Sequence, residues 1–263
     1  MIQTTVSLRS VALPTEHGGW SLTLEPVALG LMVEPGWAGA ALGAVAILGF
    51  VARTPLKLVL VDRQRGRTLA RTRLAGRVAA MELALAGLLF AFAVTTAEAA
   101  FWWPLAAAVP LIGLELWYDM HSRSRRLMAE LAGSLGASSM AAAIALAGGA
   151  ATAVAAGLWC VAGARAVAAI PFIRQQVRRL KGQPHSRLAS DIAQGVAVAA
   201  VVAAAVVEAA PVAAVVVVVL MALVHMALAY LPPPPVPVLG AEQVVIGLTV
   251  VVTTALGALA QFG

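Results

Sequence analysis

Charged residues are scarce in this sequence. They make up 11% of its 263 residues, whereas a soluble domain carries about 25%. Apolar residues reach 61%. So little polar surface excludes a soluble globular protein and favours the lipid bilayer as the solvent of the folded chain.

Cysteine and histidine are also sparse. The single cysteine, Cys160, lies in an apolar run and has no partner for an internal disulfide. The four histidines lie in separate segments without the recurring spacing of zinc ligands. We therefore expect no metal site and no cofactor. The net charge of +6 does not indicate a nucleic-acid partner, because the basic residues are divided among several connections between apolar segments.

Apolar segments of helical length fill most of the chain. A hydrocarbon core of about 30 Å needs around 20 helical residues. The sequence predicts an all-α, polytopic transmembrane helix bundle of about nine spans, forming a single transmembrane domain over residues 1–263. The expected spans are 17–33, 38–55, 77–97, 100–118, 128–147, 151–173, 190–208, 211–231 and 240–261. The second could continue to Val61, and the proline run beginning at Pro232 predicts an extended linker through Pro237.

The distribution of positive charge predicts an orientation. All but two of the 18 Lys and Arg residues lie at or between spans two and three, four and five, and six and seven. The alternate connections carry Glu34, Glu98 and Glu208 instead. Because positive residues mark the cytoplasmic side, we expect a multi-pass protein of the inner (plasma) membrane, with its N-terminus in the cytoplasm and its C-terminus outside.

Ionisable residues inside the spans are costly in lipid and usually face a partner or a cavity. Glu25 and Arg165 lie mid-span, and we expect them to pair and to face one cavity together with Arg174. Glu115 and Glu130 lie near span ends, where they either reach the interface or the basic loops, or face the same cavity. A lone His225 among Val and Leu indicates a helix–helix hydrogen bond more than a ligand.

Two further segments allow alternative interpretations. Residues 14–20 read as a helix start, or as a cytoplasmic opening lined by Glu16, His17 and a glycine pair. Asp119 is followed by three arginines. It has two alternative roles, a structural ion pair with these arginines or a functional role in the site. The basic loops set topology and bind anionic head groups, while a subset could form a fork-shaped phosphate site.

Several stretches, which together run across most of the chain, resemble the YwiC-like membrane protein family. The similar residues are Pro14 to Trp20, Glu25-Pro26, Gly30, Arg53 to Lys57, and Arg165 through Pro171 to Arg174. That family is essentially uncharacterised, so this resemblance implies a membrane protein and little chemistry.

A more distant resemblance is to the UbiA superfamily of intramembrane prenyltransferases. It is carried by Tyr118-Asp119 through the arginines at 123, 125 and 126 to Glu130 and Gly133. It implies nine helices and an active site open to the cytoplasm. The two Asp-rich motifs that hold Mg²⁺ and diphosphate there are absent here. Arg53 and Lys57 lie near the position of the first, and Arg174 and Arg178 near that of the second.

Two functions follow as expectations. One is a UbiA-like transferase or a binder of a phosphorylated, isoprenoid-type lipid, with a polar cavity open to the cytoplasm. The alternative is a transporter or accessory membrane protein for a small anion. The candidate catalytic residues are Glu16, His17, Glu25, Asp119 and Glu130, and the candidate substrate-binding residues are Arg53, Lys57, Arg125, Arg165, Arg174 and Arg178.

Overall fold

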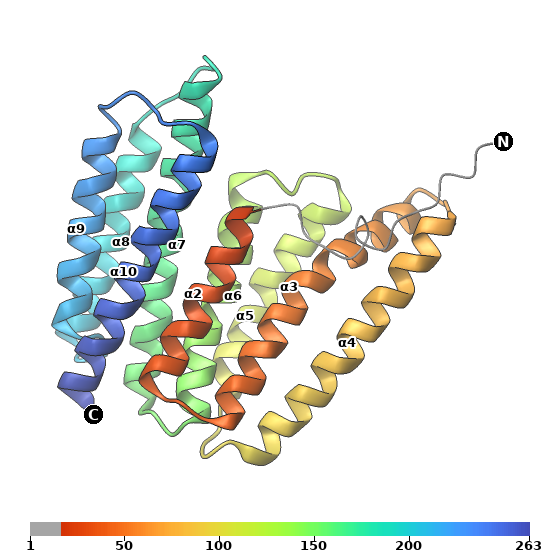
Figure 1. Ribbon diagram of the computed structural model, residues 1–263, viewed down its shortest axis with the longest axis horizontal. Helices are drawn as coiled ribbons and strands as arrows, with labels where there is room; N and C mark the ends of the chain where they lie inside the picture. Colours follow the sequence, from red (N-terminus) through yellow and green to blue (C-terminus); the bar gives the residue numbers. More distant parts are fainter. Residues whose placement is uncertain (1–16) are drawn as a thin grey trace.

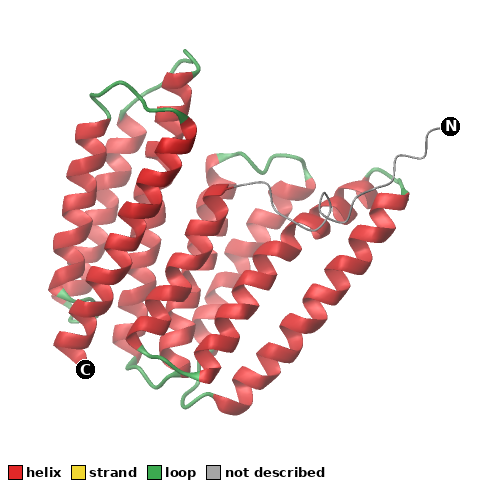
Figure 2. Ribbon diagram, in the orientation of Figure 1, coloured by secondary structure: helices red, strands yellow, loops and turns green. Residues whose placement is uncertain are grey.

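The computed structural model describes residues 17–263, in which every regular element is a helix (Figure 2). The helices are α2 (His17–Val33), α3 (Trp37–Gln64), α4 (Ala70–Thr96), α5 (Trp102–Met120), α6 (Leu127–Ala147), α7 (Thr152–Leu180), α8 (Leu188–Val206), α9 (Val212–Leu228) and α10 (Val236–Phe262).

Successive helices run in opposite directions, so the connections fall at two ends of the bundle (Figure 1). One end carries the connections 65–69, 121–126, 181–187 and 229–235, and we call it the basic end because most of the arginines lie there. The opposite end carries the short turns 34–36, 97–101, 148–151 and 207–211. The structure thus brings the three basic connections to one end, as the charge pattern predicts.

Six of the nine helices in residues 17–263 are long and apolar enough to cross a membrane: α3, α4, α6, α7, α8 and α10. α9 is apolar but shorter. The molecule is therefore a multi-pass membrane protein, and the count of nine spans stays a prediction.

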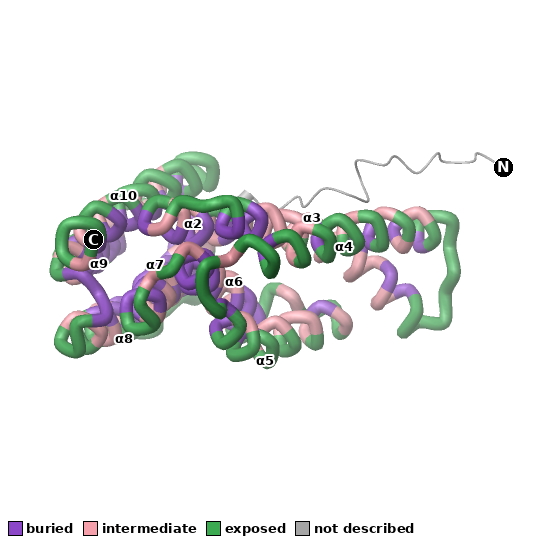
Figure 3. Tube along the Cα trace, turned by 90° about the horizontal axis from the view of Figure 1, so that it is seen from below, coloured by how far each residue is buried: buried purple, intermediate pink, exposed green. Residues whose placement is uncertain are grey.

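The core is made largely of small side chains on α6 and α7. Figure 3 shows these two helices buried in the middle, with α2 and α3 on one side and α5 and α8 on the other. Gly30 lets α2 approach α6, because a Cβ at that position would lie 2.8 Å from Ile144 Cβ. A second apolar cluster joins α7, α8, α9 and α10 around Val201 and Val218. Close packing of small residues is the usual way that membrane helices associate.

Several helix boundaries differ from those expected. α3 continues through Pro55 to Gln64, and α7 continues through Pro171 to Leu180. α10 begins at Val236, so Pro237 lies inside the helix and not in the linker as expected. Proline is tolerated there because the first-turn N–H groups have no helical acceptor.

Candidate functional site

A groove of about 560 Å³ lies between α2, α3, α5 and α6. This volume is within the range of about 300–1,000 Å³ typical of small-ligand sites. Most of its wall is apolar, and it extends from Leu105 and Met140 to Arg53 and Glu115 near the basic end. Its lining includes Leu22, Ala46, Phe50, Leu56, Val109, Ile112, Leu116 and Ala137.

The groove is accessible between α3 and α5. α3 packs mainly against α4, while α5 packs mainly against α6, so the two walls are only sparsely joined. Gly49 on α3 and Gly113 on α5 are exposed, and a Cβ at either position would meet no atom within 4 Å. An elongated apolar molecule could therefore enter from the side of the bundle.

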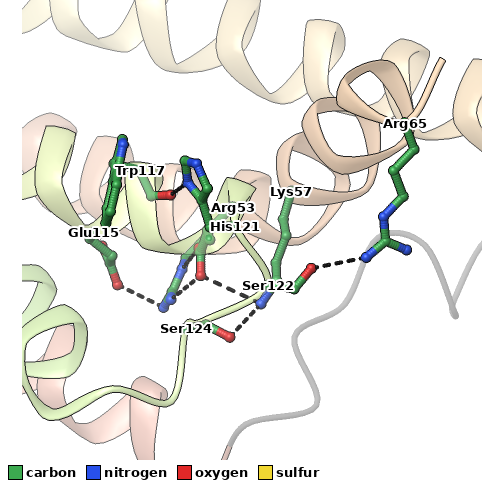
Figure 4. Close-up of polar contacts among 9 residues, drawn as sticks. Arg53, Lys57, Arg65, Glu115, Trp117, His121, Ser122 and Ser124 are labelled. Carbon is green, nitrogen blue, oxygen red and sulfur yellow. Dashed lines mark hydrogen bonds and ion pairs between the residues drawn. The ribbon is translucent and has the colours of Figure 1, made fainter.

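An ion-pair cluster closes the groove at the basic end (Figure 4). Arg53 Nη1 lies 2.8 Å from Glu115 Oε1, and Arg53 Nε donates to Asp119 Oδ2 at 2.8 Å. Lys57 Nζ lies 3.4 Å from Asp119 Oδ1 and donates to Ser124 Oγ at 2.7 Å. The guanidinium of Arg53 thus binds two carboxylates of α5, those of Glu115 and Asp119.

Burial divides the roles within this cluster. The Asp119 side chain is fully buried, while 24% of the Arg53 side chain and 13% of that of Glu115 are exposed. Asp119 therefore anchors Arg53, and Arg53 and Glu115 present the polar surface of the groove. The Glu115 carboxylate packs against Gly133 of α6, where an added Cβ would overlap it.

A second polar cluster is buried among α2, α7, α8, α9 and α10. Arg165 Nε lies 3.4 Å from Glu25 Oε2, so the expected pair is present. Arg165 also donates to the backbone carbonyl of Gln243 at 2.7 Å and to Gln243 Oε1 at 3.3 Å. Ser21 donates a hydrogen bond to Glu25. Both charges are almost wholly buried.

Hydrogen bonds continue from this pair through His225. Gln243 Nε2 lies 3.1 Å from His225 Nε2, and His225 Nδ1 lies 3.3 Å from Gln194 Oε1. Gln194 Nε2 donates to the Ala168 carbonyl at 2.9 Å. Gln243 Oε1 faces Arg165, so Gln243 Nε2 donates to His225 Nε2. His225 Nδ1 then donates to Gln194 Oε1, which requires a neutral imidazole with its proton on Nδ1. His225 thus joins helices through hydrogen bonds, as expected.

The space around this second cluster is small. The cavity beside Glu25 and Arg165 measures about 10 Å³, which is about the room that one water needs. The groove is many times larger. The buried network therefore joins helices, and the groove is the better candidate for a binding site.

Arg174 belongs to neither cluster. Its Nη1 lies 2.8 Å from Glu130 Oε2 and donates to the Arg125 carbonyl at 2.9 Å. We expected Arg174 to share a cavity with Arg165 and Glu25, but the structure pairs it with another helix. The Arg178 side chain is exposed and has no hydrogen bond or ion pair within residues 17–263. Glu16 and the side chain of His17 lie outside the described part of the chain.

The candidate residues thus form three groups, with Arg53, Lys57 and Asp119 at the groove. The sequence reasoning did not single out Gln194, Gln243 or Ser124. The two glutamines could have been found, because each is an amide in an otherwise Ala- or Val-rich span and needs a buried partner. Ser124 carries no such signal. Among residues 17–263, no group of three or more His, Cys, Asp or Glu side chains is placed to hold a metal ion.

Two acidic residues meet at the opposite end. A Cβ at Gly148 would lie 2.6 Å from Glu34 Cβ, and one at Gly149 would lie 3.1 Å from Glu98 Oε2. Burial raises the pKa of Glu34, and the neighbouring Glu98 carboxylate raises it further. Both effects favour the protonated form of Glu34.

The helices define a multi-pass α-helical membrane protein, and the groove is its candidate binding site. The sequence profile of the family described as YwiC-like protein matches residues 13–145. This is just over half of the chain, and the chain belongs to that family. A search of curated proteins and a search of solved structures each found no match. The resemblance to UbiA therefore stays a prediction.

Proposed function

We propose that this protein binds a membrane lipid with a phosphorylated head group in the groove between α2, α3, α5 and α6. The observation that carries the proposal is the combination of a long apolar wall with Arg53 and Glu115 at one end. An acyl or isoprenoid chain would lie along the wall. The head group would meet Arg53, whose guanidinium suits phosphate oxygens, in place of the Glu115 carboxylate that Arg53 contacts in this structure.

The location of the polar end supports this assignment. Positive loops favour the cytoplasmic side, so we infer that Arg53 and Lys57 lie at the level of the inner-leaflet head groups. Arg65 donates to Ser122 at 3.3 Å across the same end, and the arginines of the connection 121–126 add further positive charge there. The field at the mouth of the groove therefore favours an anionic ligand.

Anion transport is the weaker alternative. A transporter needs a polar path through both ends of the bundle. The buried Glu25–Arg165 network is closely packed, with room for about one water. Towards the opposite end, α8 and α9 consist mainly of Ala and Val, which offer no polar groups to a hydrated anion. These features support lipid binding over passage of a hydrated anion.

Groove-filling substitutions test the proposal. Gly49→Leu and Gly113→Leu place side chains in open space inside the groove without a clash at Cβ. We expect native mass spectrometry of the purified protein to show a co-purifying phospholipid or isoprenoid phosphate, with one bound lipid fewer per protein in the double variant. Gly87→Leu, on an exposed face of α4 that also has open space, is the matched control. Equal lipid content in all three proteins would refute the proposal.

Any transferase activity on the bound lipid is expected to be independent of Mg²⁺. The motivation is the lack of Asp-rich motifs in the sequence, since Arg and Lys can bind phosphate but not a cation. Turnover of an isoprenoid diphosphate should therefore persist in EDTA. Loss of activity in EDTA, followed by recovery with Mg²⁺, would show that the aspartates serve a metal.

A further inference from the structure

A second pocket, separate from the groove, lies between α3 and α4 at the basic end. It measures about 410 Å³ and is lined in part by Arg63, Arg73, Arg77, Thr68 and Thr72. Arg63 lies in the last turn of α3. Arg73 and Arg77 are one helical turn apart on α4, so their side chains project from the same face.

The three arginines carry charge that the protein does not neutralise. Within residues 17–263, none of their side chains forms a hydrogen bond or an ion pair. Asp62, which precedes Arg63 in the sequence, is 2% exposed. Its carboxylate is already held by Arg71 Nη2 at 3.1 Å and by Thr72 Oγ1 at 2.6 Å. Three like charges around one pocket favour an anion with several oxygens.

The free face of α4 continues from these arginines into apolar side chains. α4 packs mainly against α3 and lies at the edge of the bundle (Figure 1). Met81 is 73% exposed and Leu88 is 70% exposed. At 3.6 residues per turn, both lie on the stripe that begins at Arg73 and Arg77. The surface is thus cationic at its basic end and apolar further along.

We infer that the α3–α4 pocket binds an anionic glycerophospholipid. Its head-group phosphate lies among Arg63, Arg73 and Arg77, and an acyl chain lies along Met81 and Leu88. A free phosphate ion would match the arginines but not the apolar stripe. A zwitterionic phospholipid would match the stripe, but its cationic group would oppose the net positive pocket. This inference does not depend on the proposed function of the groove.

Lipid retention in native mass spectrometry tests this site. The purified chain is incubated with phosphatidylglycerol, with phosphatidylcholine, or with phosphatidylglycerol plus millimolar inorganic phosphate. The wild type is expected to retain one phosphatidylglycerol in preference to phosphatidylcholine, with phosphate not abolishing that preference. One arginine near a membrane surface changes anionic-lipid affinity by about fivefold. Arg73→Gln with Arg77→Gln should therefore weaken retention by about 25-fold.

The matched control removes the same charge elsewhere at the basic end. Lys181→Gln with Arg187→Gln removes two cations of the connection 181–187, outside the α3–α4 pocket. This variant is expected to retain phosphatidylglycerol as the wild type does. Equal loss in both double variants would mean a general charge effect and would overturn the inference. Equal retention of the two lipids by the wild type, or complete displacement by inorganic phosphate, would also overturn it.

Discussion

Two glutamates in this protein are held in the same manner, each against a glycine of a neighbouring helix. Glu25 of α2 packs on Gly247 of α10, and Glu115 of α5 packs on Gly133 of α6. An arginine from a third helix then reaches each carboxylate. The lack of a side chain at these glycines therefore fixes the depth at which each ion pair forms.

The Glu25–Arg165 pair is expected to be strongly coupled. Glu25→Gln or Arg165→Gln leaves an uncompensated charge or a lost partner in the protein interior, which costs about 3–5 kcal/mol. The double variant should recover part of this loss, because no unpaired charge remains. Thermal unfolding in detergent measures the three variants against the wild type. Losses that simply add would contradict the coupling.

The half-exposed pair Arg174–Glu130 provides the comparison. Its side chains are 28% and 32% exposed, and exposed pairs contribute about 0–1 kcal/mol. Glu130→Gln and Arg174→Gln should therefore change the unfolding temperature little. Burial, and not the number of ion pairs, decides which substitution is severe.

At the scale of the helices, the sequence composition predicted which segments are helical better than it predicted where each helix begins and ends. The long apolar segments indicated every helix in the described part of the chain. α3 and α7 extend beyond the predicted spans, to Gln64 and Leu180, each across a proline that packing by neighbouring membrane helices can support. Helix limits depend on such tertiary contacts, which sequence periodicity does not contain.

The close approach of α10 to α2 gives a prediction about glycine. Gly247→Ala puts a Cβ where the Glu25 carboxylate lies, and should lower stability by about 1–3 kcal/mol because the pair must shift. Gly240→Ala on the same helix meets open space. It should stabilise slightly, by about 0.5–1 kcal/mol, since glycine weakens a helix interior. Thermal unfolding of the two variants compares them directly, and similar values would contradict this account.

The turns at the opposite end should make stability depend on pH. Because the pKa of Glu34 is raised in the folded state, its contribution is fully present below the pKa of an unfolded glutamate. It is lost as the pH rises through the folded pKa. Glu34→Gln should therefore be more stable than the wild type at neutral pH, and the two should converge near pH 4.

Unfolding temperatures measured across the acidic to neutral range test this prediction. A constant difference between wild type and Glu34→Gln at every pH would contradict the assignment to Glu34.

At the scale of the whole molecule, part of the site followed from the sequence and part did not. Two opposite charges at mid-span depth had to find partners, so the pairing of Glu25 with Arg165 was predictable although 140 positions separate them. The contact of Arg53 with Asp119 depends on how α3 faces α5, which no local pattern reports. The groove itself arises from sparse packing between helices, and its existence could not be read from composition.

The alternation of basic and acidic connections predicts the orientation of the molecule in the membrane. Reporter fusions after Gln64 and Gly182, at the basic end, should read as cytoplasmic. Fusions after Gly148 and Ala210, at the opposite end, should read as external. A cytoplasmic signal after Ala210 would contradict the nine-span arrangement.

The lateral opening between α3 and α5 determines which measure of ligand concentration governs binding. A lipid that enters through this opening diffuses in two dimensions, and its relevant concentration is its mole fraction in the bilayer, not its molarity in water. Even a modest preference over bulk lipid would then keep the groove occupied. In detergent the same ligand is diluted into micelles, so the apparent affinity should fall as the detergent-to-protein ratio rises, although no contact in the groove has changed.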